Sequence, residues 1–195
     1  MGTKKLLCPV VALLVIHLFV SSAAAQEGEP LLHRGLQEVG ISTGFGWSFE
    51  SDRTVNTVPL ALYWGYIFTD PEKDSALRGC WEVLVEGSFN YLFHHQRKYG
   101  VGLAGLLRYN VLASQSVVPY LQVGMGVWHS NLKMDDFPPD FNFAPQAGVG
   151  FQWFLCPTSA LGMEYRVQHF SNAGLHKHNT GLNLHNIRIS FSRYF

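Results

Sequence analysis

The feature that most constrains this chain is a recurring alternation of apolar and polar residues in segments of about ten residues. Successive side chains of a β-strand point to opposite faces, so the alternation predicts strands with one apolar and one polar face. Turn-forming residues separate the segments. We expect eight strands, at about residues 37–48, 57–68, 80–92, 99–112, 117–128, 142–154, 160–170 and 184–195.

An even number of such segments fits a barrel in which each strand pairs with the next and the last pairs with the first. Closure satisfies the hydrogen bonds that an open sheet would leave at its edges. The predicted fold is therefore all-β, an eight-stranded antiparallel up-and-down transmembrane β-barrel. Residues 26–195 are expected to form it as one domain.

The polar face of the predicted strands carries a balanced set of charges. In a soluble carrier of the lipocalin kind, the apolar face lines the interior, whereas in a membrane barrel it faces lipid. Three acids and three bases on the polar face can neutralise one another inside a narrow lumen, which favours the membrane orientation. These residues are Glu82, Glu86, Arg108, Glu164, Arg166 and Arg188.

Aromatic residues point to the same orientation, although the soluble carrier stays an alternative. Tryptophans lie toward the ends of the segments, as the interfacial girdles of membrane barrels require. The chain ends in Phe195 after an alternating strand, which resembles the terminal signal of outer-membrane barrels. The tryptophans are Trp47, Trp64, Trp81, Trp128 and Trp153.

Residues 1–25 have the composition of a secretory signal peptide. Lys4 and Lys5 precede a mostly apolar run, and small residues follow it as far as Ala25. We expect cleavage near Ala25 and export of the mature chain to the bacterial outer membrane.

Composition limits the partners. Charged residues make up only 14% of the chain, and 14 lysines and arginines balance 14 acids, so no nucleic-acid partner is expected. Membrane lipids are the expected surroundings, and a homodimer stays open. Cys80 and Cys156 could pair in an oxidising compartment, although their strands are not neighbours.

His169 and Ser171 continue the apolar series of the segment at 160–170, which is an unusual place for a base and a nucleophile. Two residues apart on a strand, they lie on one face about 6–7 Å apart, close enough for a shared proton. The plain alternative is that strand ends become polar where they reach lipid headgroups. The spacing alone does not decide between the two.

The sequence around this pair resembles the carboxy-terminal signature of the PagL lipid A 3-O-deacylases. The resemblance implies an outer-membrane barrel whose active site faces lipid, with lipid A of lipopolysaccharide in the outer leaflet as its substrate. It implies Ser171 as the nucleophile, His169 as the general base, and no cofactor. The residues that carry it are Arg166, His169, Phe170, Ser171, Asn172, Ala173, Gly174, Leu175, Asn179 and Gly181.

The same resemblance implies how an oxyanion is stabilised. Asn179 would donate to it, together with backbone N–H groups around Asn172 to Gly174. Asn172 could instead fix the loop through side-chain to backbone hydrogen bonds.

One residue departs from the family pattern. Asn183 occupies the position of the acid that orients the histidine. Hairpin geometry predicts Asn183 opposite Ser171 and His185 opposite His169, on the outer face. An asparagine oxygen can hold the imidazole tautomer but cannot stabilise the imidazolium by charge. Glu164 is no substitute, because its side chain is expected in the lumen.

A metal site and a non-enzymatic barrel are two alternatives to this enzyme. His176, His178 and His185 lack a thiolate or carboxylate partner at ligand spacing, so no metal is expected. A non-enzymatic small barrel, serving adhesion or envelope structure, is the main rival, and the missing acid is its best support.

Overall fold

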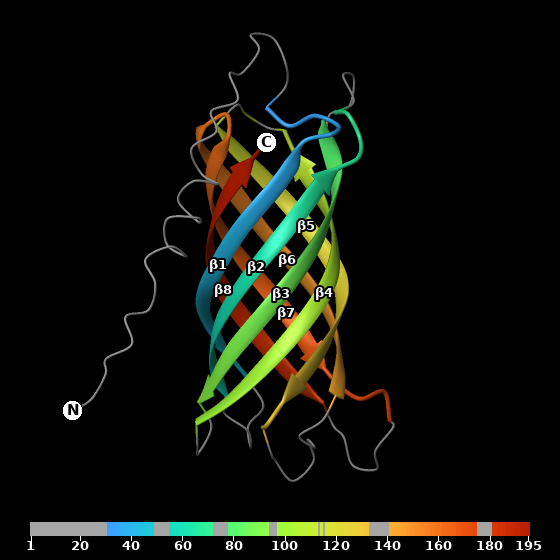
Figure 1. Ribbon diagram of the computed structural model, residues 1–195, viewed down its shortest axis with the longest axis vertical. Coiled ribbons are helices and arrows are strands. Elements are labelled where there is room, and N and C mark those ends of the chain that lie inside the picture. Colours follow the sequence, from blue (N-terminus) through green and yellow to red (C-terminus); the bar gives the residue numbers. More distant parts are fainter. Residues whose placement is uncertain are drawn as a thin grey trace, which may run out of the picture.

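The computed structural model describes residues 31–48, 55–71, 78–93, 97–112, 114, 116–132, 141–174 and 181–195. The expected signal peptide lies outside them. Eight antiparallel strands form a closed barrel in which each strand pairs with the next and β8 pairs with β1 (Figure 1). The strands are β1 (Gln37–Trp47), β2 (Asn56–Ile67), β3 (Gly79–Phe93), β4 (Arg97–Val111), β5 (Val117–Ser130), β6 (Phe141–Cys156), β7 (Ser159–Phe170) and β8 (Leu182–Tyr194).

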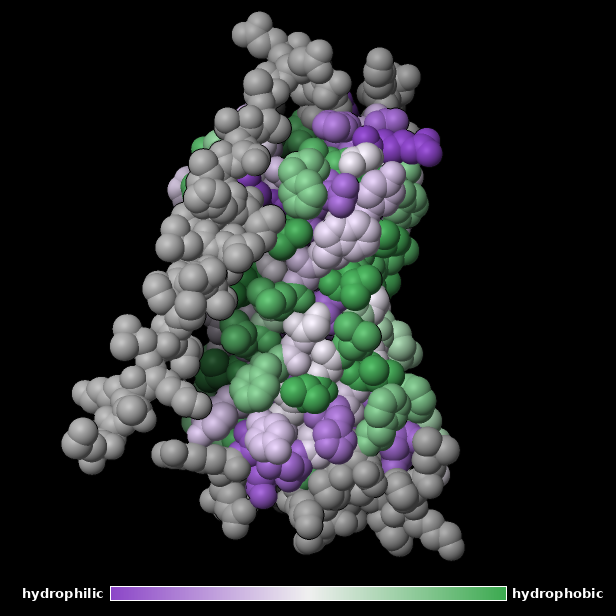
Figure 2. All heavy atoms as spheres, viewed as in Figure 1, coloured by the Kyte–Doolittle hydropathy of each residue, from purple (hydrophilic) through white to green (hydrophobic). Residues whose placement is uncertain are grey.

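The predicted fold is confirmed, and each expected segment coincides with one strand to within about two residues. Alternation of burial along every strand assigns its two faces. Apolar side chains such as Leu62, Leu121 and Ile189 are at least 60% exposed on the outer wall. Figure 2 shows hydrophobic side chains gathered around the middle of the wall and hydrophilic ones toward its ends. This is the membrane-barrel orientation, and the soluble carrier with an apolar lumen was the wrong alternative.

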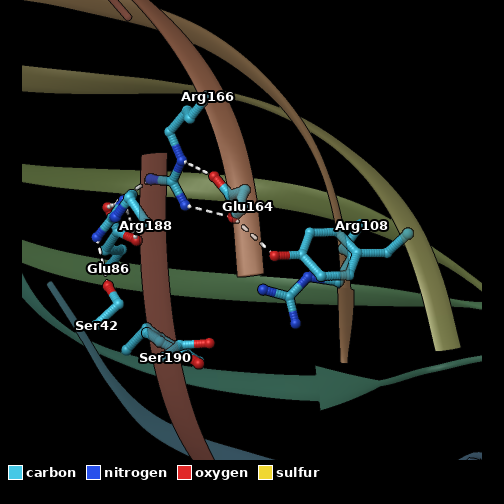
Figure 3. A pocket seen from close by; sticks show the side chains of 9 residues that line it. Ser42, Glu86, Arg108, Glu164, Arg166, Arg188 and Ser190 are labelled. Carbon is cyan, nitrogen blue, oxygen red and sulfur yellow. Dashed lines mark hydrogen bonds and ion pairs between the residues drawn. The ribbon is translucent and has the colours of Figure 1, made fainter. Parts of the chain in front are cut away.

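The six charged residues expected on the polar face all lie in the lumen. Arg166 bonds Glu86 at 2.7 Å and also pairs with Glu164, while Arg188 bonds Glu86 at 3.2 Å (Figure 3). Arg108 bonds Glu82 at 3.4 Å and Glu38 at 2.9 Å. Glu38, on β1, was not among the predicted lumen charges. Buried charges are tolerated only when paired, so the interlocked pairs hold opposite walls of the barrel together.

Clusters of buried apolar residues lie at both ends of the barrel. At the end that holds the β7–β8 connection, the cluster contains Val55, Leu92, Trp128, Leu132, Ala144, Phe170, Leu182 and Leu184. At the end that holds the carboxy terminus, it contains Leu32, Ile67, Cys80, Val118, Phe154, Ala160 and Tyr194. In the described residues, packed apolar side chains therefore fill the interior at each end of the barrel.

The prediction that Trp128 belongs to the interfacial girdle was wrong. It is only 2% exposed and packs against Phe170, with ring centroids 4.5 Å apart. The even-numbered residues of β5 face the lumen, so Trp128 points inward although it lies near a strand end. Trp64, Trp81 and Trp153 are exposed on the outer wall, as expected.

Two further findings concern the rest of the chain. Cys80 is buried and Cys156 is exposed, and both are free thiols. Within the described residues, no helix is both long enough and apolar enough to cross a bilayer.

Candidate active site

The β7–β8 hairpin forms the candidate site, at the end of the barrel opposite the carboxy terminus (Figure 1). His169 lies opposite Asn183, and Val167 lies opposite His185. The predicted register, with Asn183 opposite Ser171 and His185 opposite His169, was therefore wrong by two residues. A two-residue shift keeps every side chain on its face, so the alternation could not reveal it. Pairs such as Glu164 opposite Arg188 in the lumen are compatible only with the observed register.

His169 and Asn183 are joined by a hydrogen bond on the outer wall. Nδ1 of His169 lies 2.8 Å from Oδ1 of Asn183. An amide oxygen can only accept, so the imidazole carries its proton on Nδ1 and presents Nε2 as the basic atom. Asn183 thus holds the imidazole ring in one orientation. It adds no negative charge beside the ring.

Gly181 lies directly against the imidazole of His169. A Cβ built on Gly181 would be 2.7 Å from Cε1 and 3.2 Å from Nε2 of that ring. The residue also has a φ of +77°, in the left-handed region that favours glycine. In the sequence, Gly181 stands out only as part of the motif. Its packing role became visible once the chain was folded, because it depends on contact across two strands.

Ser171 continues β7 by one residue through backbone bonds to β6. Its N–H donates to the carbonyl of Phe143 at 3.1 Å, and its carbonyl accepts from the N–H of Phe143 at 2.7 Å. This bridge fixes the backbone of the candidate nucleophile. In the described part of the chain, no hydrogen bond joins Ser171 Oγ to His169, so proton transfer requires rotation of the serine side chain. Catalytic hydrogen bonds are often long before substrate binds.

Asn172 organises the turn that follows. It is 1% exposed, and its Oδ1 accepts the N–H of Gly174 at 3.1 Å. Ala173 and Gly174 have φ values of +53° and +80°. This is the side-chain to backbone bond of the loop-fixing alternative. It also engages the Gly174 N–H, one of the expected oxyanion donors.

The other expected donor, Asn179, lies outside the described residues, as do His176 and His178. Where the chain is described, no group of histidine, cysteine, aspartate or glutamate side chains could hold a metal ion.

Solved structures share this fold. The outer membrane enzyme PagL is 19% identical with a TM-score of 0.59, over 78% of this chain and 97% of that one. Neisserial surface protein A is 13% identical with a TM-score of 0.62, over 83% of this chain and all of that one. Ail of Yersinia pestis is 14% identical with a TM-score of 0.51, over 83% and 99%. At these identities the likeness establishes the barrel fold alone.

The family comparison is more specific. No curated protein matches the sequence. The model of the family described as lipid A 3-O-deacylase (PagL) matches residues 37–192, which include His169, Ser171 and Asn183. The match spans nearly the whole barrel, from the first strand to the last. The chain therefore belongs to the PagL family of lipid A 3-O-deacylases.

Proposed function

We propose that this protein is an outer-membrane esterase that removes the 3-O-linked hydroxyacyl chain from lipid A in the outer leaflet. The observation that carries the proposal is the His169–Asn183 hydrogen bond on the lipid-facing wall, where His169 lies two residues from Ser171 on the same face. A polar dyad placed against hydrocarbon costs free energy, so its presence there suggests a function. A substrate that is itself a membrane lipid explains the position, because its ester reaches the enzyme from the side.

The reaction follows the two steps of a serine esterase. Ser171 Oγ attacks the ester carbonyl while His169 Nε2 takes its proton. The tetrahedral intermediate collapses, the sugar 3-hydroxyl leaves with that proton, and the acyl group stays on Ser171. Water, deprotonated by the same nitrogen, then attacks the acyl-serine and releases the hydroxy fatty acid with Ser171 restored.

The oxyanion of each intermediate needs hydrogen-bond donors. We assign this role to Asn179 and to backbone N–H groups at Asn172 to Gly174, where one well-placed donor contributes about 3–4 kcal/mol. The Gly174 N–H would have to leave Asn172 Oδ1 to take part. Among the backbone groups, the N–H groups of Asn172 and Ala173 are therefore the first candidates.

Asn183 would act as the positioning residue of the histidine. Its oxygen holds the Nδ1–H tautomer that catalysis requires. Because it is neutral, it stabilises the imidazolium less than a carboxylate would. The enzyme is thus expected to be slower than one with an acid at this position.

The alternative is a non-enzymatic outer-membrane barrel. Two observations favour it: the neutral Asn183, and a barrel that matches neisserial surface protein A about as well as it matches PagL. Mass spectrometry of lipid A from cells with and without the protein separates the two. The enzyme predicts loss of one hydroxyacyl group, abolished by Ser171→Ala and by His169→Asn. Unchanged lipid A in cells that contain folded wild-type barrel would support the alternative.

A further inference from the structure

Phe141 and Phe143 are two aromatic residues on the outer wall beside Ser171. Phe143 lies opposite Ser171 and exchanges two backbone hydrogen bonds with it, at 2.7 and 3.1 Å. The Cα atoms of such a pair lie about 5.5 Å apart, and its side chains share one face of the sheet. Asn183 flanks the dyad from β8, so the phenyl ring of Phe143 is the corresponding neighbour of the candidate nucleophile on β6.

The rings of Phe141 and Phe143 together make an aromatic corner. Phe141 is 49% exposed and Phe143 is 36% exposed. Their centroids lie 5.9 Å apart and their planes cross at 86°, an edge-to-face contact that stabilises both rings. β6 begins at Phe141, so this residue lies roughly 7 Å closer to the end of the barrel than Phe143. The aromatic corner therefore extends from the level of Ser171 toward that end.

The plain alternative is that both rings belong to the interfacial girdle. Girdle positions favour tryptophan and tyrosine, whose polar tips reach the headgroups while their rings stay in the apolar layer. A phenyl ring has no such tip, and yet Phe141 is the first residue of β6. An apolar partner in the headgroup layer suits this ring better than the headgroups themselves.

The proposed substrate brings such a partner to this place. Its acyl chain stays in the hydrocarbon, toward the middle of the barrel, and its sugar stays among the headgroups, toward the end. With the ester carbonyl at Ser171, the sugar is joined to that carbonyl through a single oxygen atom, so its ring lies beside the aromatic corner. Most substituents of a glucosamine ring lie near its plane. Its faces therefore present C–H groups, which the negative face of an aromatic ring attracts.

We propose that Phe141 and Phe143 bind the glucosamine ring of the substrate while its ester lies at Ser171. The inference rests on the proposed function and adds to it the recognition of the sugar. One face of the sugar packs on the aromatic corner, and the sugar hydroxyl groups stay among the headgroups. This contact holds the ester from the side opposite its acyl chain, so it favours sugar esters over esters of small open-chain alcohols.

The test compares two esters of the same 3-hydroxy fatty acid. One is the ester of the glucosamine 3-hydroxyl, and the other is the ester of isopropanol, which is also a secondary alcohol but has no ring. Competing hydrolysis by the purified barrel in mixed micelles gives the ratio of their kcat/KM values. Phe141→Leu and Phe143→Leu should each lower kcat/KM on the sugar ester about tenfold, the upper effect of one aromatic contact, and leave kcat/KM on the isopropyl ester unchanged.

Two further variants serve as controls. Phe141→Tyr keeps the aromatic ring and should keep the wild-type ratio. Phe89→Leu is the matched control, because Phe89 is 43% exposed on the outer wall and stacks on Tyr99 but lies on β3. It should leave both rates as they are in wild type.

The remaining outcomes overturn the inference in distinguishable ways. An unchanged ratio and unchanged rates in both leucine variants would assign the two rings to the girdle alone, while the esterase proposal stands. Losses of equal size on both esters would show that the rings only support the strand that holds Ser171. If wild type hydrolyses neither ester nor lipid A, both proposals fall together.

Discussion

Oδ1 of Asn183 lies 2.8 Å from Nδ1 of His169, across the strand pair that joins β7 to β8. Because the register of the hairpin places Asn183 opposite His169, it also determines which tautomer the proposed base adopts. The residue that orients the histidine is neutral in this chain. Replacement of Asn183 can be tested separately from replacement of the proposed nucleophile.

Replacement of Asn183 tests orientation against charge. Asn183→Leu keeps much of the volume but removes the acceptor, so we expect at least a tenfold loss of lipid A deacylation as the imidazole loses its fixed tautomer. Asn183→Glu should retain or raise activity, because a carboxylate supplies the same acceptor and stabilises the imidazolium. Rates would be measured by release of the hydroxy fatty acid from purified lipid A. Complete loss in Asn183→Glu would mean that the amide has a role that an acid cannot fill.

Gly181→Ala should abolish the proposed deacylation without unfolding the barrel. The added methyl group would meet the His169 ring at 2.7 Å, and φ of +77° is unfavourable for alanine. Displacement of the ring by even 1 Å can cost about 100-fold in rate. Gly105→Ala is the matched control, because a Cβ there meets nothing within 4 Å. Equal activity of the two variants would show that Gly181 does not position the histidine.

Glu86→Ala should destabilise the barrel strongly. Glu86 pairs with both Arg166 and Arg188 in the lumen, and removal of one partner from buried ion pairs costs about 3–5 kcal/mol. Urea unfolding in detergent micelles, followed by tryptophan fluorescence, measures the change in the free energy of unfolding. Val85→Ala changes the outward-facing neighbour on the same strand and should cost much less. A loss in Glu86→Ala no greater than that of the control contradicts the role given to the lumen network.

Tryptophan quenching tests the orientation of the barrel in a bilayer. Two variants, one that retains only Trp153 and one that retains only Trp128, would be reconstituted with lipids brominated on their acyl chains. Trp153 is exposed on the outer wall and should be quenched, whereas Trp128 packs against Phe170 inside the barrel and should be protected. Quenching of Trp128 and protection of Trp153 would mean that the faces are inverted.

Local alternation was sufficient to predict the strands and the two faces of each. The period of two is a property of each segment alone, so the strand positions, the outward apolar wall and the lumen charges were all predictable. The motif around His169 and Ser171 likewise indicates the family without any knowledge of the geometry. Glu38 was missed although the alternation of its own segment places it on the polar face with Ser42.

Tertiary structure alone decided the contacts that cross strands. Register shifts by two residues leave the faces unchanged, so only the closed barrel could place Asn183 opposite His169 instead of Ser171. The contact of Trp128 with Phe170 and the packing of Gly181 against the imidazole depend on the same inter-strand geometry. The sequence by itself determined which side chains share a face, because that follows from the pleat of each strand. Which of them touch was decided by the register at which the eight strands close.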